Sequence, residues 1–119
     1  MYKIKVEAEF SSAHNLRGYK GKCEELHGHN WKVELAAGSK NLDKVGMVLD
    51  FKFLKRKLNS VLDKLDHKYL NRVDYFKKAN PTSENIAKYI YDRLGDKVPG
   101  LVSITVWESE KSCATYDGE

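Results

Sequence analysis

The nine-residue stretch CEELHGHNW, residues 23–31, combines a thiol, two carboxylates and two histidines. If it is extended, His27 and His29 point to the same side, because side chains alternate along a strand. Two neighbouring imidazoles can bind one cation, and zinc favours imidazole nitrogens in a tetrahedral site. Gly28 leaves the opposite side uncrowded. The HGH spacing alone is a weak motif, so the interpretation depends on further ligands.

His14 is the natural third ligand. It follows the alternating stretch 2–12, and antiparallel pairing around a 15–26 connection would bring it close to His27 and His29. Three histidines with no other protein ligand form an open site, whose fourth position is left for water or substrate. Open zinc sites are typical of catalysis.

Cys23 precedes His27 by four residues and has three interpretations. It could be a small buried residue, a fourth ligand that closes a structural zinc site, or a reactive thiolate whose pKa is lowered by nearby positive charge. The polar, basic surroundings, with Arg17, Lys20 and Lys22, argue against simple burial.

Asp66 and His67 form a second pair of ionisable residues near the end of an expected helix. His67 could serve only to compensate the helix dipole. Alternatively, Asp66 could orient and charge the imidazole for proton transfer. The residues themselves favour neither interpretation.

Glu108 ends an apolar alternation formed by Val102, Ile104 and Val106. It could be a carboxylate at the end of a strand that turns to solvent. It could instead be a partly buried acceptor for a ligand with two adjacent N–H donors, such as a pterin or guanine ring.

The elements that would position these residues follow from hydrophobic periodicity. Strands are expected at 2–12, 29–36, 101–108 and about 112–117, and helices at about 51–65 and after Thr82. Asp50 and Thr82 are suitable N-caps, and Gly95 suits the position after a helix. The order β-β-α-α-β-β predicts one α+β domain over residues 1–119, with two helices on one face of a four-stranded antiparallel sheet. The sheet face that carries Trp31, Val33 and Leu35, or its reverse, would need a further subunit to cover it.

Composition narrows the class of protein. The net charge is +4, which fits either solvated lysines or attraction to an anion such as a nucleic acid or a phosphorylated small molecule. The two cysteines give no disulfide framework. No apolar run is long enough for a membrane span, and the N-terminus lacks the apolar core of a signal peptide, so we expect a cytoplasmic protein.

Six motifs follow one another along the chain: FSSAH (10–14), CEELHGHNW (23–31), GMVLDFKFLK (46–55), LDHKYLN (65–71), NPTSENIA (80–87) and VWE (106–108). In this order they resemble the 6-pyruvoyl-tetrahydropterin synthase and 6-carboxytetrahydropterin synthase family. The resemblance spans almost the whole sequence. It implies the T-fold, in which subunits form a trimeric barrel with the helices outside, and two trimers stack into a hexamer.

The resemblance also implies roles for particular residues. It implies Zn²⁺ on His14, His27 and His29, and Cys23 as a proton-transferring thiolate. It implies that Asp66 and His67 of a neighbouring subunit assist the thiolate. It implies Glu108 as the anchor of the pterin, and Thr82 and Ser83 of another chain as residues that help bind the pterin.

The implied substrate is 7,8-dihydroneopterin triphosphate, and the branch of the family sets the product. The short spacing between Cys23 and His27 resembles the branch that forms 6-carboxy-5,6,7,8-tetrahydropterin for queuosine or archaeosine synthesis. The 6-pyruvoyl branch, which only eliminates triphosphate, typically has a longer gap. Glu24 resembles the glutamate of a third branch, which makes the hydroxymethyl pterin of folate synthesis. Because Cys23 is present, we expect the carboxy branch.

A different class of function is a zinc-stabilised module that binds RNA. It would need Cys23 on the metal and aromatic residues for base stacking. The aromatic residues in question, Tyr69, Tyr75 and Phe76, lie near Lys68, Lys77 and Lys78. The family resemblance instead predicts a small-molecule substrate and no nucleic-acid or membrane partner.

Overall fold

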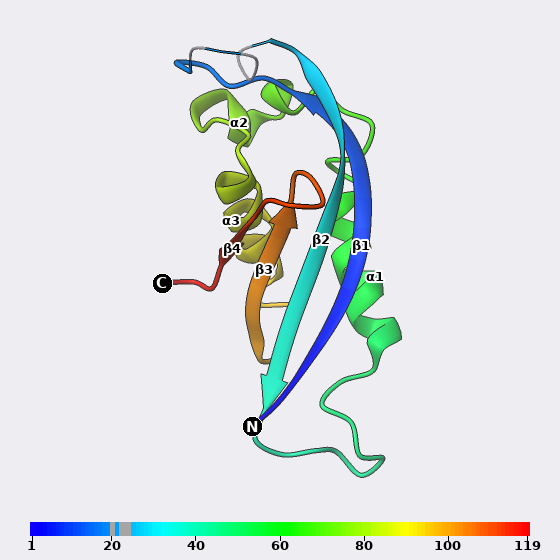
Figure 1. Cartoon of the computed structure of the whole chain (residues 1–119). Coiled ribbons are helices and arrows are strands. Elements are labelled where there is room, and N and C mark those ends of the chain that lie inside the picture. The colour runs from blue at the N-terminus through cyan, green and yellow to red at the C-terminus, as the bar shows by residue number, and fades with distance from the viewer. Residues whose placement is uncertain (20, 22–24) are drawn as a thin grey trace.

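The computed structural model describes residues 1–19, 21 and 25–119. Within them, four strands form one antiparallel sheet in the order β1-β2-β3-β4. The strands are β1 (Tyr2–His14), β2 (His27–Ser39), β3 (Leu101–Trp107) and β4 (Cys113–Tyr116). The helices are α1 (Phe51–Leu62), the 3₁₀ turn η2 (Leu70–Arg72), α2 (Asp74–Lys78) and α3 (Ser83–Leu94). Figure 1 shows the long, curved β1–β2 pair and the two long helices packed on one side of the sheet. The predicted α+β fold is therefore confirmed.

Alternation along β2 decides which sheet face meets the helices. Trp31, Val33 and Leu35 are fully buried in one core with side chains of α1 and α3. Lys32 and Glu34 point to the opposite face, which no described helix covers. The face that was expected to need a further subunit is therefore the polar one.

The helices begin where their caps predict. The carboxylate of Asp50 accepts a hydrogen bond from the backbone N–H of Lys52 at 2.8 Å. The hydroxyl of Thr82 accepts one from the backbone N–H of Asn85 at 3.1 Å. Each cap satisfies an N–H group that has no partner inside its helix.

The predicted ends of the helices were less accurate. α1 ends at Leu62 rather than 65, because the backbone N–H groups of Lys64 and Leu65 bond three residues back and tighten the chain into turns. Leu65 is still fully buried, so the apolar spacing continues beyond the helix. Gly95 directly follows α3, as predicted, and has φ −54°, which is a helical rather than a left-handed conformation.

Two short elements, η2 and α2, occupy a segment for which the periodicity predicted no helix. They are too short for a periodic pattern to be recognised. Among the described residues, no helix has both the length and the apolar character that crossing a membrane requires.

Candidate metal centre

The core-facing stripe of β2 changes from apolar side chains to imidazoles beyond Trp31. His29 and His27 continue the alternation of Leu35, Val33 and Trp31. The register of the β1–β2 pair places His14 directly opposite His27. Both strands extend further than predicted, to His14 and from His27, so the strand ends themselves carry the histidines.

Four side chains converge at this end of the sheet. Their ligand atoms, from His14, His27, His29 and Glu108, all lie within 4.8 Å of one another. His14 is only 1% exposed, and the others are half-buried. β1, β2 and the residue that follows β3 supply them, so the sheet fixes their relative positions.

Backbone carbonyls place a proton on Nδ1 of two of the rings. His14 donates through Nδ1 to the carbonyl of Pro81 at 2.7 Å, and His27 donates through Nδ1 to the carbonyl of Glu25 at 2.8 Å. A neutral imidazole with its proton on Nδ1 has a lone pair on Nε2. The two Nε2 atoms lie 3.0 Å apart, so two lone pairs face each other. A metal cation beside both nitrogens would make that contact favourable.

The third ring points to the same conclusion. His29 Nε2 is buried and has no hydrogen-bond partner among the described residues. A buried polar atom without a partner is costly and needs a physical reason. Together with the Nε2 atoms of His14 and His27, this nitrogen fits a zinc ion. The carbonyls that hold His14 and His27 are the outer partners that metal-binding histidines usually have.

Burial disfavours the charged form of two of the imidazoles. Burial lowers the pKa of His14 below its ordinary value, although the Pro81 carbonyl opposes this. Burial likewise lowers the pKa of His29, against the opposing charge of Glu108. Since only a neutral imidazole can bind a metal, both rings are ready to act as ligands near neutral pH.

Glu108 does not simply turn to solvent. It lies two residues after the fully buried Val106. Its side chain is 32% exposed, and its Oε1 lies 3.4 Å from His29 Nε2. From this position it can either complete a metal site or accept N–H groups from a ligand bound beside the histidines.

Asp66 and His67 lie in the turns after α1, outside the histidine cluster. Asp66 accepts the backbone N–H of Ser11 at 2.9 Å, and its other oxygen lies 3.0 Å from His67 Nδ1. The bond from Ser11 is the main reason that the pKa of Asp66 is lowered. His67 has φ +55°, which is uncommon for a residue other than glycine, and its N–H donates to the carbonyl of Ser11 at 2.6 Å.

These contacts weigh against dipole compensation as the role of His67. α1 ends at Leu62, and the effect of a helix dipole fades beyond the last turn. The carboxylate of Asp66 instead orients the imidazole, whose side chain is 83% exposed. The pair lies at the surface of the subunit, and its role in proton transfer stays a prediction.

Thr82 and Ser83 begin α3. Besides its capping contact, Thr82 donates its backbone N–H to the carbonyl of Asn80 at 2.8 Å, and Ser83 is 9% exposed. Thr82 directly follows Pro81, whose carbonyl holds His14. A role of Thr82 and Ser83 in binding substrate stays a prediction.

Sequence reasoning did not identify two asparagines that hold the segment after His14. The amide of Asn71 accepts the N–H of Asn15 at 3.0 Å and donates to its carbonyl at 2.8 Å. Asn80 clamps Arg17 in the same way, at 3.1 and 2.7 Å. Both asparagines lie inside motifs that were recognised, LDHKYLN and NPTSENIA, which was the available signal.

Replacing Asn71 by Ala should destabilise the protein by about 1–3 kcal/mol, because two backbone groups of Asn15 lose their partner in a largely buried place. Urea denaturation measures the change. Asn59→Ala on the exposed side of α1 is the matched control and should alter stability by less than about 0.5 kcal/mol. Equal effects would show that the Asn71 clamp contributes nothing specific.

Cys23 and Glu24 lie outside the described residues, and their predicted roles stay predictions. The stacking surface of the RNA-binding interpretation is wrong in one respect, because Phe76 is fully buried. Tyr75 packs against Phe76 and Tyr89, with ring centroids 5.1 and 5.2 Å apart.

Comparison with known proteins identifies the family to which the chain belongs. The family model for 6-pyruvoyl tetrahydropterin synthase matches residues 3–119. The chain belongs to this family. A 6-carboxy-5,6,7,8-tetrahydropterin synthase of a Synechocystis species is 40% identical, over 98% of this chain and 93% of the relative. A dihydroneopterin monophosphate aldolase of Pyrococcus furiosus is 35% identical, over 92% of this chain and 91% of the relative.

Structural similarity agrees with the family assignment. The solved 6-pyruvoyl tetrahydropterin synthase of Caenorhabditis elegans superimposes with a TM-score of 0.90 at 31% identity, covering 99% of this chain and 96% of the other. The T-fold predicted from the motifs is thereby confirmed for the subunit of this family member.

Proposed function

We propose that this protein is a zinc-dependent 6-carboxy-5,6,7,8-tetrahydropterin synthase. It would convert 7,8-dihydroneopterin triphosphate and water to 6-carboxytetrahydropterin, acetaldehyde and triphosphate, for 7-deazaguanine synthesis. The observation that carries the proposal is the cluster of His14, His27 and His29, with Glu108 beside it. The 40% identity to a relative of this name favours the carboxy branch.

When bound at the three histidines, zinc would act as a Lewis acid toward the side-chain hydroxyls of the substrate. Glu108 would accept the N–H groups of the pterin ring and so orient it, helped by Thr82 and Ser83 of another chain. Cys23 would move protons at the side-chain carbons. Asp66 and His67 of a neighbouring subunit would assist it, and their contact at 3.0 Å supports that role.

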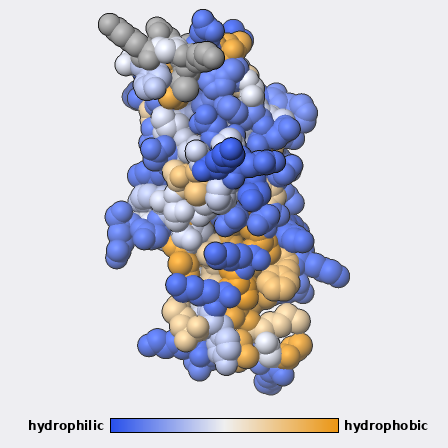
Figure 2. All heavy atoms as spheres, in the orientation of Figure 1, coloured by the Kyte–Doolittle hydropathy of each residue, from blue (hydrophilic) through white to orange (hydrophobic). Residues whose placement is uncertain are grey.

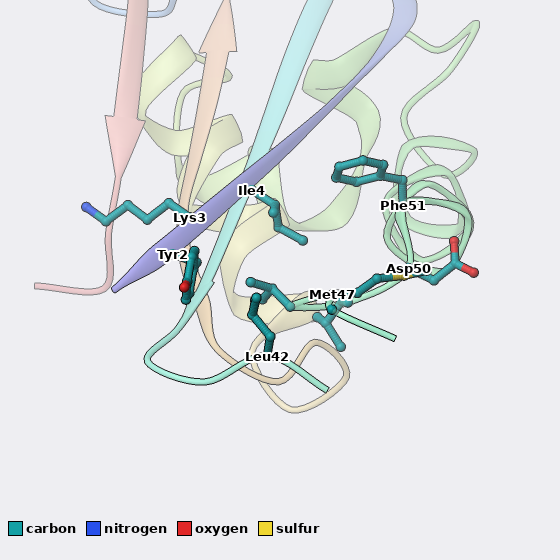
Figure 3. A pocket seen from close by; sticks show the side chains of 10 residues that line it. Tyr2, Lys3, Ile4, Leu42, Met47, Asp50 and Phe51 are labelled. Atoms are coloured by element: carbon teal, nitrogen blue, oxygen red, sulfur yellow. The ribbon is translucent and has the colours of Figure 1, made fainter. Parts of the chain in front are cut away.

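Assembly into a hexamer is part of the proposal, because the pair Asp66–His67 stands apart from the histidine cluster and His67 is largely exposed. An apolar cavity of about 490 Å³ lies where β1 begins, beside residues 42–51. This cavity also supports association of subunits. Figure 3 shows Tyr2, Ile4, Leu42, Met47 and Phe51 around it. In Figure 2 apolar side chains gather at this same end of the molecule. A neighbouring subunit would cover them.

Two other reactions on related substrates compete with this proposal. One is elimination of triphosphate alone, giving the 6-pyruvoyl product. The other is removal of most of the side chain to leave a hydroxymethyl pterin, and the similarity to a dihydroneopterin monophosphate aldolase makes the monophosphate worth testing as a substrate.

Incubation with 7,8-dihydroneopterin triphosphate, and separately with the monophosphate, tests the proposal. We expect acetaldehyde and inorganic triphosphate in equal amounts from the first and little turnover of the second. Triphosphate without acetaldehyde would assign the 6-pyruvoyl branch. Efficient conversion of the monophosphate to a hydroxymethyl pterin would assign the aldolase reaction.

Replacing Glu108 by Gln should weaken pterin binding by about 2–4 kcal/mol, because a charge-assisted acceptor is lost and a donor faces the ligand's N–H groups. Calorimetry with a pterin measures this. Glu110→Gln, at an exposed position just beyond, is the matched control and should bind as the parent does. Zinc content should not change in either variant. Loss of zinc from Glu108→Gln would make Glu108 a metal ligand instead.

A further inference from the structure

A second hollow, of about 410 Å³, lies beside the segment that follows α1. Its lining residues are Lys64, His67, Lys68, Tyr69, Arg72 and Val73. None of them belongs to the histidine cluster, but His67 is one of the two residues of the proposed proton-transfer pair.

The hollow carries positive charge without a counter-ion. In the described part of the chain, no carboxylate forms an ion pair with Lys64, Lys68 or Arg72, whereas Lys77 and Lys88 each have one. Asp66 is engaged by Ser11 and His67. All three cationic side chains are exposed, so their charged ends are available to a ligand. Three cationic side chains without an ion-pair partner around one hollow favour a polyanion.

The wall of the hollow is held firmly to β1. The carbonyl of Lys68 accepts the backbone N–H of Ala13 at 3.0 Å, and the N–H of Lys68 donates to the Ser12 hydroxyl at 3.0 Å. The hydroxyl of Tyr69 donates to the side chain of Asn15 at 2.5 Å. These anchors flank His14, so the cations project from a fixed frame beside the metal centre's own strand.

We propose that this hollow binds the oligophosphate tail of the substrate. The inference rests on the proposed function, because the hollow would bind triphosphate, the leaving group of the proposed substrate. A tail with several negative charges matches several cations grouped at one hollow, and Arg and Lys are the usual partners of phosphate oxygens. His67 then faces the same substrate as the cations. The proposed proton transfer in the active site of the neighbouring subunit requires this.

Titration of inorganic triphosphate into the full chain tests the proposal directly. Treatment with a chelator beforehand prevents triphosphate from binding zinc. The double variant Lys68→Ala/Arg72→Ala should bind about tenfold more weakly or worse. The matched control, Lys55→Ala/Arg56→Ala, removes the same two residue types from exposed positions on α1 and should bind within about twofold of the parent.

Kinetics of the zinc-loaded enzyme give a second measurement. The KM for dihydroneopterin triphosphate should rise by about tenfold in Lys68→Ala/Arg72→Ala, while affinity for neopterin, which lacks phosphate, and zinc content stay unchanged. Unchanged triphosphate affinity and KM would overturn the proposal. Displacement of triphosphate by a single-stranded RNA would overturn it too, by making the hollow a nucleic-acid site. If the parent binds triphosphate through these cations but turns over no pterin, the hollow stands and the proposed function fails.

Discussion

Replacing Cys23 by Ala should stop turnover while zinc and pterin remain bound. The expected loss in rate is about 10²–10⁴-fold, the usual contribution of one general base. A thiol beside a bound cation can have a pKa near neutral pH, which suits it to this role. Steady-state rates, elemental analysis and pterin calorimetry on the same preparation measure the three properties separately.

The alternative role for Cys23 is that of a fourth zinc ligand, which would make the site structural. His14, His27 and His29 converge among the described residues, and Glu108 lies beside them. A catalytic zinc needs only three protein ligands and a free position. If Cys23→Ala loses metal along with activity, the site is closed and the catalytic interpretation is wrong.

Glu24 provides the built-in control for this experiment. Glu24→Ala should affect the rate much less than Cys23→Ala, since the carboxy branch uses the thiolate. The reverse order of effects, with Glu24→Ala inactive and Cys23→Ala merely slowed, would favour the branch in which glutamate takes over that role.

Replacing His27 or His29 by Ala should remove zinc from the protein. Two imidazoles hold zinc poorly, so the loss in affinity should exceed the roughly 10–100-fold that removal of an outer-shell partner costs. The fold should survive, because both side chains lie at the end of the sheet rather than among the core leucines. Elemental analysis after gel filtration measures the metal.

His67→Ala is the matched control for these variants. It removes an exposed imidazole outside the cluster and should retain zinc in full. Activity should still fall, because His67 belongs to the proposed proton-transfer pair. Full zinc content in both His27→Ala and His29→Ala would refute the metal assignment.

The convergence of the site could be predicted because it follows from strand geometry. Alternation placed His27 and His29 on one side, and antiparallel pairing brought His14 opposite His27. Glu108 was singled out because it continues the parity of Ile104 and Val106, which face the core. Each step used a local rule that tertiary packing did not override.

The supporting contacts could not be predicted, since they join segments far apart in the sequence. The carbonyl of Pro81 orients His14, and Asn71 and Asn80 clamp the residues that follow it. Such contacts depend on the path of the chain after α1, where the helix ends earlier than its apolar spacing indicates. The basic hollow has the same origin, because it forms only when turns and η2 bring its cations together.

Mass spectrometry of the pterin formed from 7,8-dihydroneopterin triphosphate tests the central claim most directly. The zinc-loaded protein is expected to yield 6-carboxy-5,6,7,8-tetrahydropterin, in which a carboxyl group has replaced the longer side chain. A product that retains the full side chain, a hydroxymethyl pterin, or unchanged substrate would contradict the proposed reaction.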